Sequence, residues 1–575
     1  MKKPFLWSAV SIFAFGAVVW IFAQIVPART DLSSLFPDNA LLYIEAKDFA
    51  GLLNAWNSSN EKRVWLKGDN YAAFNRSRLF DRLAQAQGEF SAAASIPTDE
   101  SLLSSIAGTE SALAIYDIGN LQFVYVSRMP QAKIEATPLW QVRNKFEQRT
   151  EGAAQFYVHV DQQSSRTAAF AARDGWLILA TREDLVAGVL DRLQGSHPHS
   201  LPDEPWFADS LKQASGPAGD LRMVLNLEKL VPSPYFRSYW VQRNITEMKQ
   251  YRAALCDLRR GSDTYREDRI LLRKPGVNST ALSDVTSLLS VAPEDAVFSS
   301  AQASPDPDRV LAAIRENLLE LKPVRQQASL VSAPASVSSE NAGSASMLEE
   351  RIDVAPIIAA HTDSYQPLRS LLVAAQPSAI LQAYATRSAK DDMFVGIDRA
   401  VVLVSSSPWD ESALQSAIAA ALRPGLTASQ LGIEWVRHSG ANGTYSSLTG
   451  EVPLYMTLQE NQLFLANSEP LLDAVLSRRK LPPSSQSGPI TYGGVFQHTP
   501  REQQTFRRLV ERLDSAGHSP SNPDPGPTDG QSPAFFSGNI ASLSRMFATV
   551  DRETVSERDE GAQVTQTVLY YWRRP

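Results

Sequence analysis

Cysteine is almost absent from this sequence, which has a single one, Cys256, among 575 residues. One thiol cannot form an intramolecular disulfide or a cysteine-based metal site. We therefore expect Cys256 to be a small buried residue of a strand-like segment, ALCDLRR. Histidine is also scarce. Among seven histidines only His197 and His199 lie close together, in a polar loop without metal-ligand spacing. No metal site is predicted.

Recognisable catalytic motifs are missing as well. The chain has no G-x-S-x-G elbow, no Walker loop and no dinucleotide glycine fingerprint. Two S-x-x-K matches, Ser59 to Lys62 and Ser477 to Lys480, lack an apolar shell and an S-D-N or K-T-G partner. We expect no catalytic, cofactor-binding or metal-binding residues, and favour a protein that is not an enzyme.

An excess of basic charge is also lacking, since 55 Lys and Arg face 62 Asp and Glu for a net charge of −7. Phosphate backbones require a basic face, so nucleic acid is excluded as a partner. The aromatic and basic segment 233–252 is the best candidate binding surface, and ordinary core packing is the alternative. Hydrophobic residues make up 43% and charged residues 20% of the chain, as in folded globular proteins.

Long apolar runs are absent beyond residue 28, but one lies at the N-terminus. Lys2 and Lys3 precede an apolar run from Pro4 to Val26. A helix of this length spans a hydrocarbon core of ~30 Å. We predict a cytoplasmic stub and transmembrane signal-anchor over 1–27, with the body in the periplasm or extracellular space. A cleaved signal peptide is the alternative.

The body contains an internal similarity. Segments 168–192 and 454–478 align without a gap, and both have the pattern of a strand, a tight turn, a strand and an amphipathic helix. Further matches pair Gly108 with Gly396, and 221–230 with 535–543. We predict a first repeat over 28–275 and a second over 276–575. The Ser/Ala/Pro-rich and Pro/Gly-rich stretches 324–347 and 515–533 are predicted to be flexible insertions.

Each repeat is predicted to be an α+β unit with mainly antiparallel sheets, because short turns join several of its strands. The helices are expected to begin at Asp48 and Glu183, with more helix between Glu61 and Ala94. The strands expected in the first repeat are 41–46, 112–118, 122–129, 155–160, 168–173 and 176–181.

The segment LFPDNALLYIEAKDFAGLLNAW (35–56) resembles a bacterial envelope family that is catalogued only as a domain of unknown function. The resemblance lies in Pro-Asp-x-Ala, a short strand with an acidic residue, then a helix that ends in Trp56. It implies an N-terminal anchor or signal and a large exported α+β body. It implies no catalytic residue.

Three functions follow from these observations. The favoured one is a non-enzymatic binding or scaffold protein of the cell envelope, with an envelope protein or a lipid as partner. The alternatives are a cell-envelope hydrolase with dispersed catalytic residues, and a carrier of a lipid or other apolar ligand between sheet and helices. A deep polar pocket would favour the hydrolase, and an open apolar channel would favour the carrier.

Overall fold

The computed structural model describes most of the chain, and its contacts divide the chain into two compact units. The described residues are 31–59, 62–63, 66, 71, 75, 78–196, 199–214, 216–234, 248–277, 283–303, 305–319, 355–387, 396–426, 434–448, 453–479, 489–497 and 550–572. Unit 1 comprises Met1–Arg63, Tyr71–Arg259 and Arg269–Lys274, and unit 2 comprises Val64–Asn70, Arg260–Asp268 and Pro275–Pro575.

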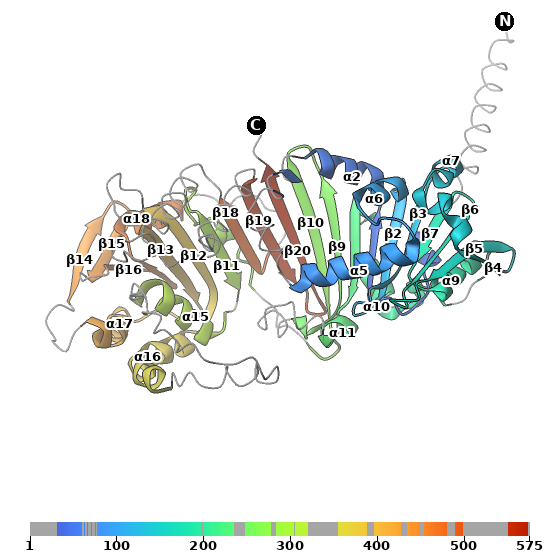
Figure 1. The fold of residues 1–575 in the computed structure, drawn as a ribbon. Coiled ribbons are helices and arrows are strands. Elements are labelled where there is room, and N and C mark those ends of the chain that lie inside the picture. The colour runs from blue at the N-terminus through green and yellow to red at the C-terminus, as the bar shows by residue number, and fades with distance from the viewer. Residues whose placement is uncertain are drawn as a thin grey trace, which may run out of the picture. The chain divides into compact units, whose positions relative to one another are not determined.

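Unit 1 is organised around antiparallel strands (Figure 1). The strands are β1 (Leu42–Ala46), β2 (Glu110–Asp117), β3 (Gln122–Arg128), β4 (Glu147–Glu151), β5 (Ala154–Val160), β6 (Thr167–Arg173), β7 (Trp176–Ala180), β8 (Leu221–Asn226) and β9 (Tyr251–Arg260), with β10 (Thr264–Arg273) paired to β9. They pair in the order β4–β5–β6–β7–β3–β2–β1–β8–β9. Local sequence signals set several elements. Asp48 caps α2 by accepting a hydrogen bond from the Gly51 amide at 2.9 Å.

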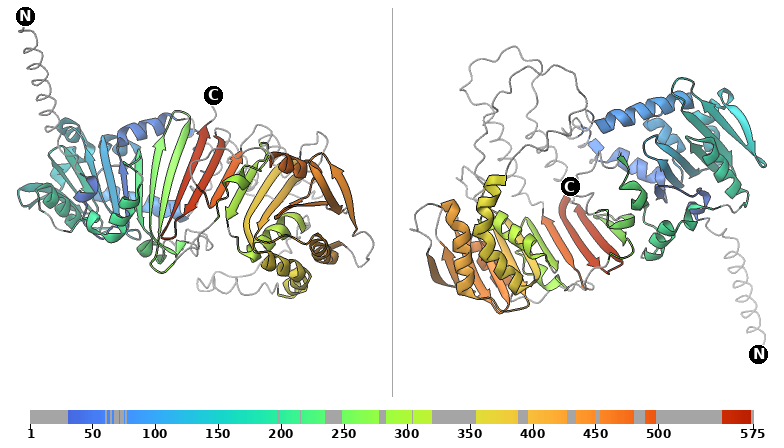
Figure 2. Two further views of the ribbon diagram at one scale, coloured as in Figure 1. Left: turned by 180° about the vertical axis from the view of Figure 1, so that it is seen from behind. Right: turned by 90° about the horizontal axis from the view of Figure 1, so that it is seen from below.

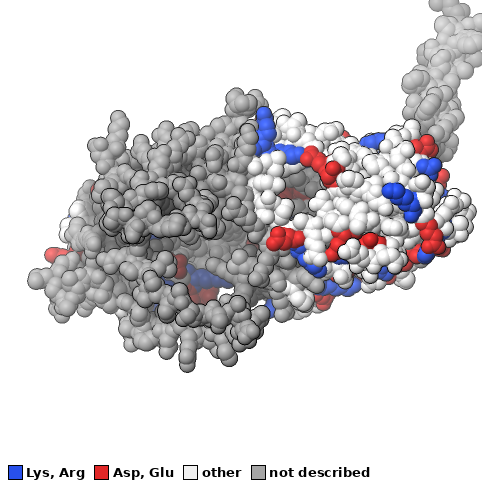
Figure 3. Space-filling view, viewed as in Figure 1, with Lys and Arg blue, Asp and Glu red and all other residues white. Residues whose placement is uncertain are grey.

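Helices cover both faces of this sheet. They are η1 (Leu32–Leu35), α2 (Phe49–Ser58), α5 (Arg78–Ala94), α6 (Glu100–Ile106), α7 (Gln131–Glu135), α8 (Pro138–Gln141), η2 (Arg143–Lys145), α9 (Glu183–Leu193), η3 (Leu201–Asp203), α10 (Pro205–Gln213) and α11 (Leu227–Leu230). One core packs Tyr43 and Ile178 against α9 and α10. The other packs Leu177 and Phe170 against α5, α6, α7 and α8. The face crossed by α5 is largely covered by uncharged side chains (Figure 3).

Unit 2 is also built from antiparallel strands. They are β11 (Phe298–Ala303), β12 (Pro377–Arg387), β13 (Gly396–Ser405), β14 (Trp435–Gly440), β15 (Gly443–Leu448), β16 (Leu454–Gln459), β17 (Gln462–Ala466), β18 (Tyr492–Gln497), β19 (Val550–Asp559) and β20 (Gln563–Trp572). The pairing order is β14–β15–β16–β17–β13–β12–β11–β18–β19–β20. Strand for strand, this order parallels the order in unit 1.

The helices of unit 2 pack against its sheet in two cores. They are α14 (Thr286–Leu289), α15 (Pro307–Ile314), the π-helical turn η4 (Arg315–Leu319), α16 (Ala355–Ala375), α17 (Glu411–Leu426) and α18 (Glu469–Arg478). Figure 2 shows α15, α16 and α17 together on one face. Their buried side chains include Ile314, Leu368 and Ile418. On the opposite face α14 and α18 pack Leu288 and Val475 into the second core.

The predicted fold class was wrong. The described chain is organised around a large antiparallel sheet of 20 strands, rather than a transmembrane helix followed by two α+β repeats. Most of the strands predicted in the first repeat are present within a residue or two of their expected limits. Turn and alternation patterns identify strands and hairpins, because these are local features. The pairing of strand edges depends on residues that are far apart in sequence, and this pairing determines the size and order of the sheet.

The predicted single N-terminal membrane span is also corrected. Among the described residues, no helix is both long enough and apolar enough to cross a membrane. The longest, α16, has 21 residues but is interrupted by charged Asp363 and Arg369. The apolar residues Leu368 and Leu372 of this helix are buried in the core of unit 2. The segment 1–27, from which the span was predicted, lies outside the described residues.

The domain limits 28–275 and 276–575 remain predictions, and the insertions 324–347 and 515–533 lie outside the described residues. The segments 168–192 and 454–478 form β6–β7–α9 and β16–β17–α18, at equivalent places in the two pairing orders. The match of Gly108 with Gly396 was wrong, because by pairing order β13 takes the place of β3 rather than β2. The segment 535–543, which was matched with 221–230, lies outside the described residues. Among the described strands, β18 takes the place of β8.

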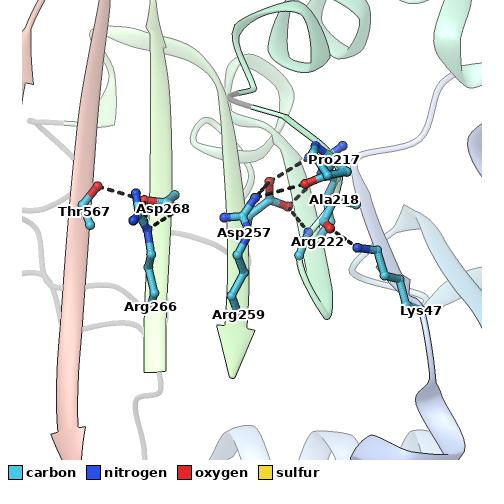
Figure 4. A network of polar contacts seen from close by, with 10 residues as sticks. Lys47, Pro217, Ala218, Arg222, Asp257, Arg259, Arg266, Asp268 and Thr567 are labelled. Atoms are coloured by element: carbon cyan, nitrogen blue, oxygen red, sulfur yellow. Dashed lines mark hydrogen bonds and ion pairs between the residues drawn. The ribbon is translucent and has the colours of Figure 1, made fainter. Parts of the chain in front are cut away.

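A buried ion pair joins β8 to β9 in unit 1 (Figure 4). Arg222 donates from Nε and Nη2 to the two carboxylate oxygens of Asp257 at 2.8 and 2.7 Å. The two residues are 9% and 3% exposed, so water screens this pair weakly. Glu45 is nearby, on β1 opposite Arg222. Burial raises the pKa of Glu45, against the hydrogen bond from Tyr43 that lowers it.

We expect Asp257→Ala to lower the free energy of unfolding by ~3–5 kcal/mol, because it leaves the Arg222 guanidinium buried without its carboxylate. Glu147→Ala is the control. It removes a carboxylate that is 2.9 Å from Arg149 but has a side chain that is 67% exposed. Because water screens such a pair, this variant should lose far less stability than Asp257→Ala. Urea unfolding of both variants measures the difference, and equal losses would contradict it.

Candidate ligand-binding cavity

One face of the unit 1 sheet carries an apolar row that crosses four strands. Ile44 of β1 lies opposite Leu113 of β2, which lies opposite Tyr125 of β3. Tyr125 in turn lies opposite Leu179 of β7. Since alternate residues of a strand point to opposite faces, these four side chains share one face and form an apolar floor that must be covered.

The cover consists of α5 and α6, with Phe49 of α2 at its side. Leu83, Ala86 and Phe90 recur on α5 at spacings of three and four residues, which places them on one side of a helix. From α6, the side chains that reach the same space are Leu102, Leu103 and Ile106.

The cover does not fill the space above the floor. A cavity of about 480 Å³ remains between α5, α6 and the sheet. Its walls are almost entirely hydrocarbon and aromatic. The polar side chains among the lining residues are Gln87, Thr98, Asp99, Ser111, Arg166 and Thr181, with the hydroxyl of Tyr125. Ligand sites in proteins typically measure ~300–1,000 Å³ and are lined mainly by apolar groups, so this cavity has the size and the chemistry of a binding site.

Polar contacts fix the cover in place. Thr98, in the connection between α5 and α6, donates from Oγ1 to the Gln87 carbonyl at 3.0 Å and donates its amide to Ser91 Oγ at 3.1 Å. Arg166 donates from Nε to Glu89 of α5 at 2.7 Å. This hydrogen bond is the main reason that the pKa of Glu89 lies below its usual value. The cavity is thus held open by fixed elements.

The inner polar groups are already engaged with one another. The Tyr125 hydroxyl donates to the Ile106 carbonyl at 3.0 Å and lies 3.2 Å from Ser111 Oγ. Ser111 Oγ lies 2.9 Å from Ser127 Oγ. Burial raises the pKa of Tyr125, so this hydroxyl stays neutral. The inner end of the cavity therefore carries no charge, and its hydroxyls serve the protein's own hydrogen bonds.

Unit 2 provides an internal comparison, because the register of its strands identifies the equivalent row. Ser300 of β11 lies opposite Gln382 of β12, which lies opposite Val401 of β13, which lies opposite Leu465 of β17. Where unit 1 has Ile44 and Leu113, unit 2 therefore has two polar residues, Ser300 and Gln382.

A polar cluster covers that row. Asn317 of η4 donates from Nδ2 to Gln382 Oε1 at 3.2 Å and accepts from the Tyr384 hydroxyl at 3.2 Å. Beside it Val310 and Ile314 of α15 are both fully buried. By contrast, α2, which follows β1 as α15 follows β11, has no buried residue. Above the equivalent row, the described part of unit 2 thus places a polar cluster, whereas unit 1 has an apolar floor there.

The candidate catalytic residues are not arranged for catalysis. Ser59 Oγ donates to the Trp56 carbonyl at 2.7 Å and accepts from the Lys62 amide at 3.0 Å, while Lys62 Nζ donates to Glu100 at 2.6 Å. The serine caps a helix end and its lysine makes an ion pair. Ser477 Oγ donates to the Ala474 carbonyl at 2.8 Å, and Lys480 lies outside the described residues.

The remaining sequence candidates are only partly described. His197 and most of 233–252 lie outside the described residues, whereas Cys256 is half-buried in β9. Across the described ranges, no three His, Cys, Asp or Glu residues are grouped to hold a metal ion. Sequence reasoning did not locate the cavity residues. The apolar spacing on α5 can be seen in the sequence. It predicts an apolar side of the helix, but it does not distinguish a side that packs tightly from one that borders a cavity.

Comparisons with known proteins identify no family for the chain. No protein-family model and no curated protein matches it. A solved structure entitled crystal form I of TP0453 is similar over 43% of this chain and 81% of its own, with 10% sequence identity and a TM-score of 0.23. A similarity of this size supports no conclusion about function.

Ala86→Phe should raise the free energy of unfolding by ~0.5–2 kcal/mol, because the new ring can bury itself in open apolar space. Ala84→Phe is the matched control. It makes the same change two residues earlier on α5, at an exposed position that does not line the cavity, and should stabilise nothing. Urea unfolding distinguishes them. A loss of ~1–3 kcal/mol in Ala86→Phe, as in an overpacked core, would show that the space is not open.

Proposed function

We propose that this protein binds an apolar ligand in the unit 1 cavity, without chemical conversion of that ligand. The observation that carries the proposal is the apolar floor of Ile44, Leu113, Tyr125 and Leu179 beneath an open space of about 480 Å³. An apolar cavity of ~150 Å³ is already sufficient to bind benzene.

The free energy of binding would come from the water that the ligand displaces from the apolar walls of the cavity. The apolar side chains around this space have no protein atoms opposite them across the opening. A hydrocarbon that enters covers them and leaves water itself, which contributes ~0.8 kcal/mol for each buried methylene group. The hydrogen bonds of Thr98 and Arg166 already tie α5 to the segments beside it, so little ordering of the cover opposes binding.

A hydrolase is less well supported by the same features. Hydrolysis requires a nucleophile or activated water beside an acid or base within hydrogen-bond reach. The polar groups of this cavity instead bond to one another, as Tyr125 and Ser111 do, or cap a helix, as Asp99 does by accepting from the Ser101 amide at 2.9 Å. Location in the cell envelope and the resemblance to an envelope family remain predictions of the sequence.

The proposal predicts saturable binding of an uncharged fluorescent probe, N-phenyl-1-naphthylamine, at one site per chain. Ala86→Phe should reduce its affinity at least tenfold by occupying the cavity. Leu103→Asp should act similarly, since it places a charge at the opening of the cavity, on a side chain that is 45% exposed and thus has little effect on folding. Fluorescence titration measures all three proteins.

Two control variants make the test specific. Ala84→Phe and Ser104→Asp alter exposed positions on the same two helices outside the cavity lining, and should bind the probe as the unaltered protein does. Circular dichroism confirms that each variant is folded. Non-saturable binding, or equal losses in cavity and control variants, would refute a ligand site at this place.

A further inference from the structure

The floor of the cavity determines which part of a ligand can lie deepest. It is formed by hydrocarbon and aromatic side chains, and the hydroxyls of Tyr125 and Ser111 already take part in protein hydrogen bonds. A charged or strongly polar group placed there would lose its hydration without gaining a partner, which is costly. The deep end therefore accepts only hydrocarbon, and any polar group of the ligand must remain at the opening.

The opening lies between α5 and α6. Two lining leucines are largely exposed there, Leu83 by 42% and Leu103 by 45%. Single exposed leucines are ordinary, but these two continue the apolar lining of a cavity, and contiguous exposed apolar surface marks ligand-binding grooves. A hydrocarbon chain that passes between them would cover both, so the opening continues the apolar character of the interior to the surface.

Several described charged residues on or beside the cavity lining make contacts within the protein. Arg166 donates to Glu89 at 2.7 Å, and Lys62 donates to Glu100 at 2.6 Å. Asp99 accepts from the amides of Ser101 and Leu102 at the start of α6. None of these pairs presents a charge that is reserved for a ligand's headgroup, as a site selective for a carboxylate or an ammonium group would require.

The volume limits the size of the chain. At about 480 Å³, the cavity has about three times the volume of the ~150 Å³ cavity that holds the six carbons of benzene. On that scale it accommodates up to ~18 carbon atoms. This is room for one long chain and not for two.

We infer that the ligand is a single-chain amphiphile that enters hydrocarbon first and is recognised by its chain, with a headgroup of any charge left at the opening between Leu83 and Leu103. This inference rests on the proposed function and specifies the ligand of that same site. A two-chain lipid is excluded by volume, and a compact polar metabolite is excluded by the apolar floor.

The test is displacement of N-phenyl-1-naphthylamine from the full-length protein by two ligand series, each kept below its solubility limit or micelle concentration. The first series is unbranched 1-alkanols of 8 to 18 carbons. We expect affinity to rise about fourfold per added methylene, the ratio that corresponds to ~0.8 kcal/mol, and to stop rising between ~14 and 18 carbons as the cavity fills.

The second series holds the chain at twelve carbons and changes the headgroup among alcohol, carboxylate and trimethylammonium. The three affinities should agree within about threefold, and Ala86→Phe should weaken all of them equally. A difference of tenfold or more between headgroups, or no dependence on chain length, would overturn the inference while saturable probe binding left the proposed function intact. Failure of the probe itself to bind would overturn both.

Discussion

The unit 1 structure depends on one constraint, which is that the apolar face of its sheet must be removed from water. The row from Ile44 through Leu113 and Tyr125 to Leu179 is fixed by strand register, so its side chains cannot turn to the other face without loss of the pairing. Helices α5 and α6 cover this row, yet they leave about 480 Å³ above it. A domain that excluded all apolar surface would have closed this space with its own side chains, because interiors pack as densely as organic crystals.

Unit 2 has the same strand order as unit 1 but different side chains at the equivalent row. Its equivalent row replaces Ile44 and Leu113 with Ser300 and Gln382, and Asn317 bonds to Gln382 from above. Ile314 is buried in the neighbouring core. Two polar residues on the floor and Asn317 in the cover thus distinguish this row of unit 2 from the apolar row of unit 1. The pairing order alone does not determine whether a cavity forms.

The sequence was informative where structure is local. The segments 168–192 and 454–478 fold as two strands and a helix because their alternation and helical spacing are contained within each segment. The match of Gly108 with Gly396 failed, because short apolar strands resemble one another and only their pairing partners distinguish them. The 20-stranded sheet was not predicted for the same reason.

The cavity was beyond sequence reasoning for a different physical reason. The spacing of Leu83, Ala86 and Phe90 shows which side of α5 is apolar, but the depth to which the helix packs depends on the volume of every neighbour. We expected from the sequence that an open apolar space would favour a carrier, and that stays a prediction. The three-dimensional arrangement of α5, α6 and the sheet shows the apolar space itself, which no local sequence pattern contains.

The central claim, that an apolar ligand occupies this space, is tested most directly by anomalous diffraction from crystals grown with a 1-alkanol carrying a terminal bromine. The account predicts a bromine peak in unit 1 above the Leu113 and Tyr125 side chains, with none above Gln382 in unit 2. A peak of equal height in both units, or bromine bound only outside the unit 1 cavity, would contradict it.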